Sequence, residues 1–262
     1  MGDWQYIRTE VDEGVAVLTI DHPPVNSFNT EVVTELNAAV DELLGDDETK
    51  VIVITGAGTN AFVAGADIPE ILEMLDKPGG LKDASEAGQG LFHKISESTK
   101  PVIAAIDGFC LGGGLELAMA CHMRICSDRT RLGQPEINLG IIPGWGGTQR
   151  LSRLAGPGKA IEMILTGDMI RAQEAFSLGL VNKVVPAGSV LKEARGLARK
   201  IAMKSKLSVA AALRSIIEGL KGTIGDGLKI EAEAFGNLES AEDAREGVSA
   251  FLEKRQPQFK DK

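Results

Sequence analysis

The chain has 262 residues, 44% hydrophobic and 25% charged, which is the composition of a globular protein with one large domain or a domain and a smaller appendage. Its 28 basic and 37 acidic residues give a formal net charge of -9, so we expect neither nucleic acid nor an anionic membrane as a partner. Three cysteines without a CxxC pair exclude a full disulfide framework and favour a reducing compartment. Without a signal peptide or a bilayer-spanning apolar run, we expect a cytoplasmic protein, although a processed mitochondrial matrix protein would look the same.

Strand-like and helix-like segments alternate over the first 200 residues. In chain order, residues 15–21 predict a strand, and apolar residues at spacings of three and four predict a helix over 30–47 with Thr30 as its N-cap. Four more strands are predicted, at 50–58, 101–108, 123–128 and 182–186. Further helices are predicted from 67, directly after a glycine cluster at 112–114, and over 148–167, where "GPG" breaks the last one. Residues 76–90, "DKPGGLKDASEAGQG", are the most loop-like stretch.

Beyond about Val190 the strands disappear and the helical periodicity continues to the C-terminus. We therefore predict an α/β core over residues 1–195 and a helical region over residues 196–262.

One short motif suggests a nucleotide site. "TGAGTNA" (55–61) follows a predicted strand and matches the GxGxxA fingerprint of dinucleotide-binding proteins. A helix should follow at once, but "FVAGADIP" follows instead, so we favour a plain glycine turn over a nicotinamide-dependent oxidoreductase. The GxSxG, Walker and HExxH motifs are absent, and the three histidines are far apart in sequence.

Four segments are more informative together: "AFVAGADI" (61–68), "GFCLGGGLELAMAC" (108–121), "GQPEINLG" (133–140) and "IPGWGGTQRL" (142–151). Each alone is ordinary, because glycines form turns and a glutamate in a helix's first turn is stabilised by the helix dipole. Together they offer backbone N–H donors from two loops and two carboxylates, Glu116 and Glu136, in apolar surroundings. Two donors aimed at one oxygen form an oxyanion hole. Two nearby carboxylates titrate together and provide an acid and a base for moving protons next to a carbonyl.

These segments, with "VAVLTIDHPPVNSFN", "KPVIAAIDGFCLGGGLELAMACHMRICSD", "AFSLGLVNKVVP" and "EGVSAFLEKRQPQFKD", resemble the crotonase superfamily over nearly the whole chain. The presence of both glutamates makes the chain similar to the short-chain enoyl-CoA hydratases in particular. The resemblance implies an α/β fold, a crotonase-like spiral of repeated ββα units followed by a C-terminal helical trimerisation region. It also implies a homo-oligomer, either a trimer or a dimer of trimers.

The resemblance assigns roles to the residues that match the family's catalytic motifs. Ala66 and Gly113 match the two backbone donors to the thioester oxygen. Glu116 matches the glutamate that activates water for attack at the β-carbon, and Glu136 the one that supplies a proton at the α-carbon. Gln134 matches a neighbour that orients a carboxylate.

Other positions match the family's CoA contacts. Ala64, Asp67 and Ile68 match the loop that holds the adenine and pantetheine parts of CoA, and Gly144 lies near the acyl site. Phe235 and Lys254 match positions where a neighbouring subunit touches the adenine and the ribose phosphate.

The implied activity is the addition of water across the 2-trans double bond of an enoyl-CoA, without a metal or redox cofactor, since CoA is part of the substrate. Double-bond isomerisation on the same frame and a non-catalytic acyl-CoA-binding or RNA-binding protein are the alternatives. Acyl chain length and pathway stay open. Trp145 and Phe28 are bulky, and either would limit chain length if it lined the acyl pocket.

Overall fold

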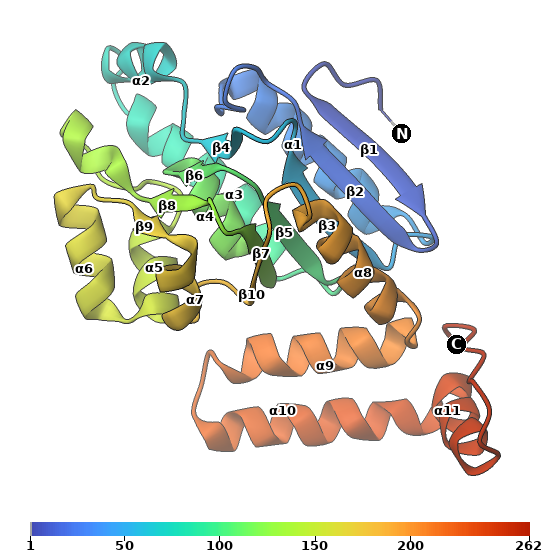
Figure 1. Ribbon diagram of the computed structural model, residues 1–262. Helices are drawn as coiled ribbons and strands as arrows, with labels where there is room; N and C mark the ends of the chain where they lie inside the picture. The colour runs from blue at the N-terminus through green and yellow to red at the C-terminus, as the bar shows by residue number, and fades with distance from the viewer. Residues whose placement is uncertain (1) are drawn as a thin grey trace.

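Two mostly parallel sheets form the body of the computed structural model, which describes residues 2–262 (Figure 1). The larger sheet has the order β1-β2-β3-β5-β7-β10, and only β1 and β2 pair in the antiparallel direction. Its strands are β1 (Ile7–Asp12), β2 (Val15–Ile20), β3 (Val51–Gly56), β5 (Val102–Ile106), β7 (Met123–Ser127) and β10 (Lys183–Val185). The smaller sheet has the order β4-β6-β8-β9, formed by β4 (Ala61–Ala64), β6 (Phe109–Leu111), β8 (Arg131–Gly133) and β9 (Ile170–Arg171).

The chain alternates between the two sheets. A strand of the larger sheet is followed by a strand of the smaller one in the pairs β3–β4, β5–β6 and β7–β8, and helices then lead to the next pair. This is the predicted spiral of ββα units. The fold also argues against a nicotinamide-dependent oxidoreductase. A dinucleotide site needs a helix directly after the glycine turn, but the turn after β3 leads into β4.

The helices of the body agree with the sequence patterns except at three places. α1 (Thr30–Gly45), α2 (Ile68–Leu75) and α4 (Gly113–Ala120) lie where they were predicted, and "GPG" separates α5 (Gly147–Ala155) from α6 (Pro157–Thr166). The short α7 (Ala172–Ser177), which follows β9, was not predicted. The N-cap of α1 is Asn29, one residue before the predicted Thr30, because the Asn29 side chain accepts the N–H of Val32.

The predicted loop at 76–90 is wrong. Most of it belongs to α3 (Gly80–Ser96), whose first half is polar and glycine-rich and therefore looks like a loop in the sequence. The helix forms because its buried face, which contains Leu91, Phe92 and Ile95, packs into the core, and tertiary packing overrides weak helix propensity.

Two apolar cores cover the two faces of the larger sheet. One contains most of the buried residues, including the buried free cysteines Cys110, Cys121 and Cys126. The other lies under α8 (Val190–Ala202), whose residues Val190, Ala194, Ala198 and Ala202 pack on the sheet. The predicted boundary at residue 195 therefore falls inside a helix that belongs to the body.

The helical region that stands away from the sheets begins after α8 (Figure 1). α9 (Lys206–Gly219) and α10 (Ile224–Asn237) lie side by side, and a turn of 3-10 helix (Leu238–Ser240) leads to α11 (Glu242–Leu252). Large apolar side chains on these helices are exposed in the single chain, among them Leu220, Ile224, Phe235 and Phe251. None of the helices within residues 2–262 combines the length and the apolarity needed to cross a bilayer.

Candidate active site

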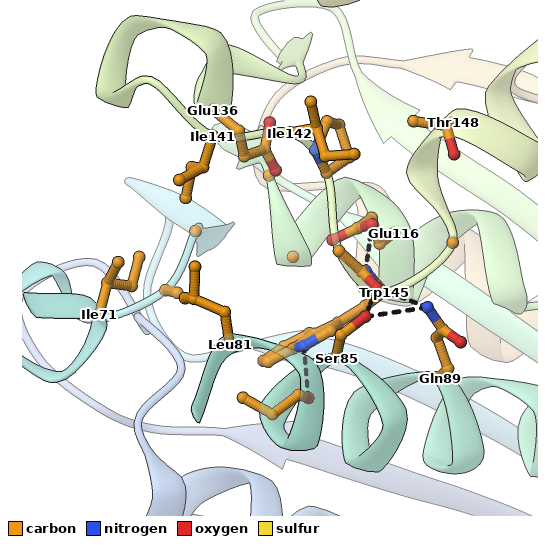
Figure 2. Close-up of a pocket in the computed structure, with 18 of the residues that line it drawn as sticks. Ile71, Leu81, Ser85, Gln89, Glu116, Glu136, Ile141, Ile142, Trp145 and Thr148 are labelled. Carbon is orange, nitrogen blue, oxygen red and sulfur yellow. Dashed lines mark hydrogen bonds between the residues drawn. The ribbon is translucent and has the colours of Figure 1, made fainter. Parts of the chain in front are cut away.

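A cleft of about 1310 Å³ lies where α2, α3, α4 and the chain from 135 to 150 meet (Figure 2). This volume exceeds the roughly 300–1,000 Å³ of ordinary small-molecule pockets, so the cleft has room for a long ligand. Seven of the residues that the sequence singled out line it: Ala64, Ala66, Ile68, Gly113, Glu116, Glu136 and Gly144.

Two backbone N–H groups reach the cleft from different loops. Beyond β4, the Phe28 N–H donates to the Gly65 carbonyl (2.9 Å), and the Asp67 N–H donates to the Phe28 carbonyl (2.7 Å). These two bonds use the residues on either side of Ala66 and leave the Ala66 N–H without a partner in the pairing. Gly113 is the first residue of α4, where an N–H has no partner within its own helix. Neither N–H donates to a protein acceptor within residues 2–262. Both are therefore available to a ligand oxygen.

The glycines before α4 let backbone and carboxylate approach closely. Gly112 has φ 51°, and a Cβ at this position would lie 2.9 Å from Oε1 of Glu136. A Cβ on Gly114 would overlap the carbonyl oxygen of Val63 in β4. The sequence "GGG" therefore packs the N-terminus of α4 tightly against the smaller sheet and leaves room for the second glutamate.

Glu116 lies in α4 with only 2% of its surface exposed. Its Oε1 accepts two backbone N–H groups, from Trp145 and Gly147, both at 2.7 Å. Burial raises the pKa of this carboxyl to about 6, and the two hydrogen bonds and the charge of Arg150 oppose that rise. Gly147 has no room for a side chain, since a Cβ there would lie 2.7 Å from the Gln134 amide and 2.8 Å from Cβ of Pro143.

Glu136 lies in a short 3-10 helix (Pro135–Leu139) that ends at Gly140 in the left-handed conformation. Burial, and to a smaller extent the nearby Glu116 carboxylate, raise the pKa of its carboxyl to about 7. The fully buried Gln134 contacts it: with the amide nitrogen facing the carboxylate, Gln134 donates to Oε1 (2.9 Å) and Oε2 (3.1 Å) of Glu136. The structure thus brings together the two glutamates and the glutamine that the sequence singled out.

Four predicted site residues do not line the cleft of the single chain: Gln134, which is buried behind Glu136, and Asp67, Phe235 and Lys254. Asp67 is the N-cap of α2, and its side chain accepts the N–H of Glu70 (3.2 Å). Phe235 in α10 and Lys254 after α11 lie on the helical region and do not line the cleft. Their predicted contacts need a neighbouring copy and stay a prediction.

Of the two bulky residues, only Trp145 lines the cleft. Phe28 and Phe92 are buried behind it, each with its ring centroid 5.5 Å from that of Trp145. The aromatic cluster makes this wall of the cleft rigid, because interlocked buried rings leave little room for movement.

Sequence reasoning missed the polar residues of the cleft other than the two glutamates, and three of them, Arg150, Ser85 and Gln89, bond to the segment that faces Glu116. Arg150 donates from Nη1 to the Trp145 carbonyl (3.0 Å) and supplies a positive charge near Glu116. Ser85 and Gln89 belong to the helix α3 that was taken for a loop, although their spacing of four would have placed them on one helix face. In the part of the chain that the structure describes, no three His, Cys, Asp or Glu residues are grouped so that they could hold a metal ion.

Fold and site together define the crotonase class, a two-sheet spiral with two backbone donors and two glutamates in one cleft.

The family model described as enoyl-CoA hydratase/isomerase matches residues 10–262. A probable enoyl-CoA hydratase of Bacillus subtilis is 45% identical over 258 residues, covering 97% of this chain and 98% of the relative. A crotonyl-CoA hydratase of Syntrophomonas wolfei is 42% identical over 257 residues, covering 98% of each chain. The solved structure of an enoyl-CoA hydratase from Bacillus anthracis has a TM-score of 0.94 at 37% identity, covering 98% of this chain and 100% of that one. The chain belongs to the enoyl-CoA hydratase/isomerase family of enzymes, and the predicted family and fold class are confirmed.

Proposed function

We propose that the protein adds water across the 2-trans double bond of short-chain enoyl-CoA thioesters and so forms 3-hydroxyacyl-CoA. One observation carries the proposal: Glu116 and Glu136, both with raised pKa values, line the same cleft as the backbone of Ala66 and Gly113. The name of the 42% identical relative, a crotonyl-CoA hydratase, supports a four-carbon acyl group as the first substrate to test.

The two backbone donors would act on the thioester. As water attacks the β-carbon, negative charge moves onto the thioester oxygen, and N–H groups already aimed at that oxygen stabilise the transition state without reorganising. The Gly113 donor lies at the N-terminus of α4, where the helix dipole adds to the stabilisation.

The two carboxyl groups would divide the proton transfers. With a pKa of about 6, Glu116 is mostly ionised at neutral pH and takes a proton from the attacking water as the new C–O bond forms at the β-carbon. With a pKa of about 7, Glu136 is protonated in a large fraction of molecules and delivers its proton to the α-carbon. A proton then passes from Glu116 back to Glu136, directly or through solvent, and restores the starting state.

The remaining site residues would bind the CoA part. Ala64, Ile68 and Gly144 line the cleft, whereas Phe235 and Lys254 would reach the adenine and its ribose phosphate from a neighbouring copy. A lysine ammonium suits that phosphate on charge grounds. Assembly into trimers or dimers of trimers, cytoplasmic location and the absence of a metal or redox cofactor belong to the same proposal.

The test is the loss of the conjugated enoyl-thioester ultraviolet absorbance when the protein is mixed with crotonyl-CoA. We expect rapid loss with the unaltered protein and a fall of at least about 100-fold in kcat for Glu116→Gln and for Glu136→Gln, since each removes a general acid–base group. Glu162→Gln, on the exposed face of α6, is the matched control and should keep full activity. No absorbance loss, with CoA still bound, would contradict the short-chain hydratase proposal and turn attention to double-bond isomerisation or longer acyl groups.

A further inference from the structure

The peptide group between Gly144 and Trp145 is bonded on both of its sides (Figure 2). On one side, the Trp145 N–H donates to Oε1 of Glu116 at 2.7 Å. On the other side, the Gly144 carbonyl accepts from Ser85 Oγ at 2.5 Å and from Gln89 Nε2 at 2.8 Å. Both of these side chains come from α3, and Gln89 Nε2 also donates to Ser85 Oγ at 2.9 Å.

The carbonyl and the N–H of one peptide group cannot turn independently. The group is planar and trans, so its C=O and N–H point in opposite directions and rotate as one unit. Ser85 and Gln89 therefore fix the direction of the N–H that faces Glu116, although neither side chain bonds to that carboxylate itself. Hydrogen bonds in such a row also polarise one another, which strengthens the last bond to the charged oxygen.

Helix α3 holds the side chain of Trp145 as well as its backbone. The indole Nε1–H donates to the Ala84 carbonyl at 3.0 Å. A Cβ on Gly88 would overlap the indole ring, so α3 lies directly against it. One helix therefore fixes the wall of the cleft and the peptide that faces Glu116.

We propose that Ser85 and Gln89 are positioning residues for Glu116, which they orient by holding the carbonyl of the Gly144–Trp145 peptide. The proposal rests on the proposed function in so far as Glu116 is taken as the base.

A hydrogen bond to the ionised form of a carboxyl lowers its pKa, so loosening the Trp145 N–H should raise the pKa of Glu116. Two other charged groups act on this carboxyl, Arg150 from α5 and Glu136 from the 3-10 helix, and the variants below leave both in place. Gly147 keeps its own bond to Oε1, so the expected change is partial.

The experiment measures kcat, KM and the pH profile of crotonyl-CoA hydration for the double variant Ser85→Ala/Gln89→Ala and for both single variants. For the double variant we expect kcat to fall roughly tenfold with KM changed less than about twofold, and the acidic limb of the pH profile to move up by about half to one unit. Ser96→Ala is the matched control, because Ser96 is in the same helix and its hydroxyl donates only to the His93 carbonyl. Ser85→Thr, which retains the hydroxyl, should recover most of the kcat lost in Ser85→Ala.

A second readout does not depend on turnover. The chain has two tryptophans, so in a Trp4→Phe background the fluorescence comes from Trp145 alone and reports the ionisation of neighbouring carboxyls. The step that Glu116→Gln abolishes should move to higher pH in the double variant. Lower turnover with the pH profile and the fluorescence step both unmoved would overturn the positioning role. A moved step in a protein that does not hydrate crotonyl-CoA would leave positioning intact and contradict only the proposed function.

Discussion

Replacing Glu116 by glutamine should stabilise the folded protein at alkaline pH while it abolishes activity. The pKa of this carboxyl is about 6 in the folded chain against an ordinary value of 4.5, and that difference corresponds to about 2 kcal/mol. Because the folded state holds the proton more tightly than the unfolded chain, stability falls as pH rises from about 4.5 to about 6, and the whole cost is present above pH 6. The isosteric glutamine carries no charge to bury, and its carbonyl oxygen accepts the same two N–H groups.

The assay is urea unfolding of the two proteins at pH 8 and at pH 4.5, at one protein concentration because an oligomer's stability depends on it. At pH 8 we expect Glu116→Gln to be more stable by about 2 kcal/mol, and at pH 4.5 the gain should largely vanish. Glu162→Gln, a change of the same size on the surface, should alter stability by less than about 0.5 kcal/mol at either pH. A loss of stability at pH 8 would refute the reasoning and show that the two N–H bonds outweigh the desolvation of the charge.

Three further predictions concern the cleft and the helix that carries Glu116. A plot of kcat against pH should be bell-shaped, with limbs at about pH 6 and about pH 7, because catalysis needs Glu116 ionised and Glu136 protonated. A kcat that does not change from pH 5 to pH 8 would contradict this division of roles. Gly114→Ala should lower the free energy of unfolding by more than about 2 kcal/mol, since the new Cβ overlaps the Val63 carbonyl, whereas Gly158→Ala, with open space around it, is the control in thermal unfolding. Trp145→Ala should improve kcat/KM for an eight-carbon enoyl-CoA relative to crotonyl-CoA by at least about tenfold, as removing the wall admits more methylenes; an unchanged ratio would show that the ring does not limit chain length.

The sequence allowed most of the body of the fold to be predicted, because its buried strands are continuous apolar runs and its long helices have a clear apolar face. The edge strand β1 of the larger sheet and all four strands of the smaller sheet were missed. In the smaller sheet β4 has four residues, β6 and β8 have three each and β9 has two, too few for any periodicity to show. Helix α3 was missed for another reason. Its first half carries glycines and charges, and only packing of Leu91 and Phe92 against the core, which sequence does not display, makes it helical.

Because helix α3 was missed, its two site residues were missed too, whereas the residues that stand in motifs were predicted. Glu116, Glu136 and the glycines stand in recognisable motifs, so the resemblance identified them and the cleft brings them together. Ser85 and Gln89 act on a backbone carbonyl about 55 residues away in the chain, and no local pattern reveals such a contact. The N–H bonds from Trp145 and Gly147 to Glu116 were equally hidden, because they depend on the direction of two peptide groups.

Glycines and charge occur together in "CLGGGLELAMAC" because a buried carboxylate needs donors that only closely packed backbone can bring. Glu116 is surrounded by buried apolar residues of α4, and its ionised form would be unfavourable there without the two N–H groups of the 145–147 segment. The Gly147 N–H comes this close because a Cβ on that residue would overlap Pro143 and Gln134, and Glu136 fits beside Gly112 because that glycine also lacks a side chain. The N–H bonds only partly offset burial, so the pKa stays raised, which suits this carboxyl to the role of base proposed for it. The part of the desolvation that the N–H bonds do not offset also lowers the stability of the folded protein. Glu116→Gln should therefore gain stability and lose activity.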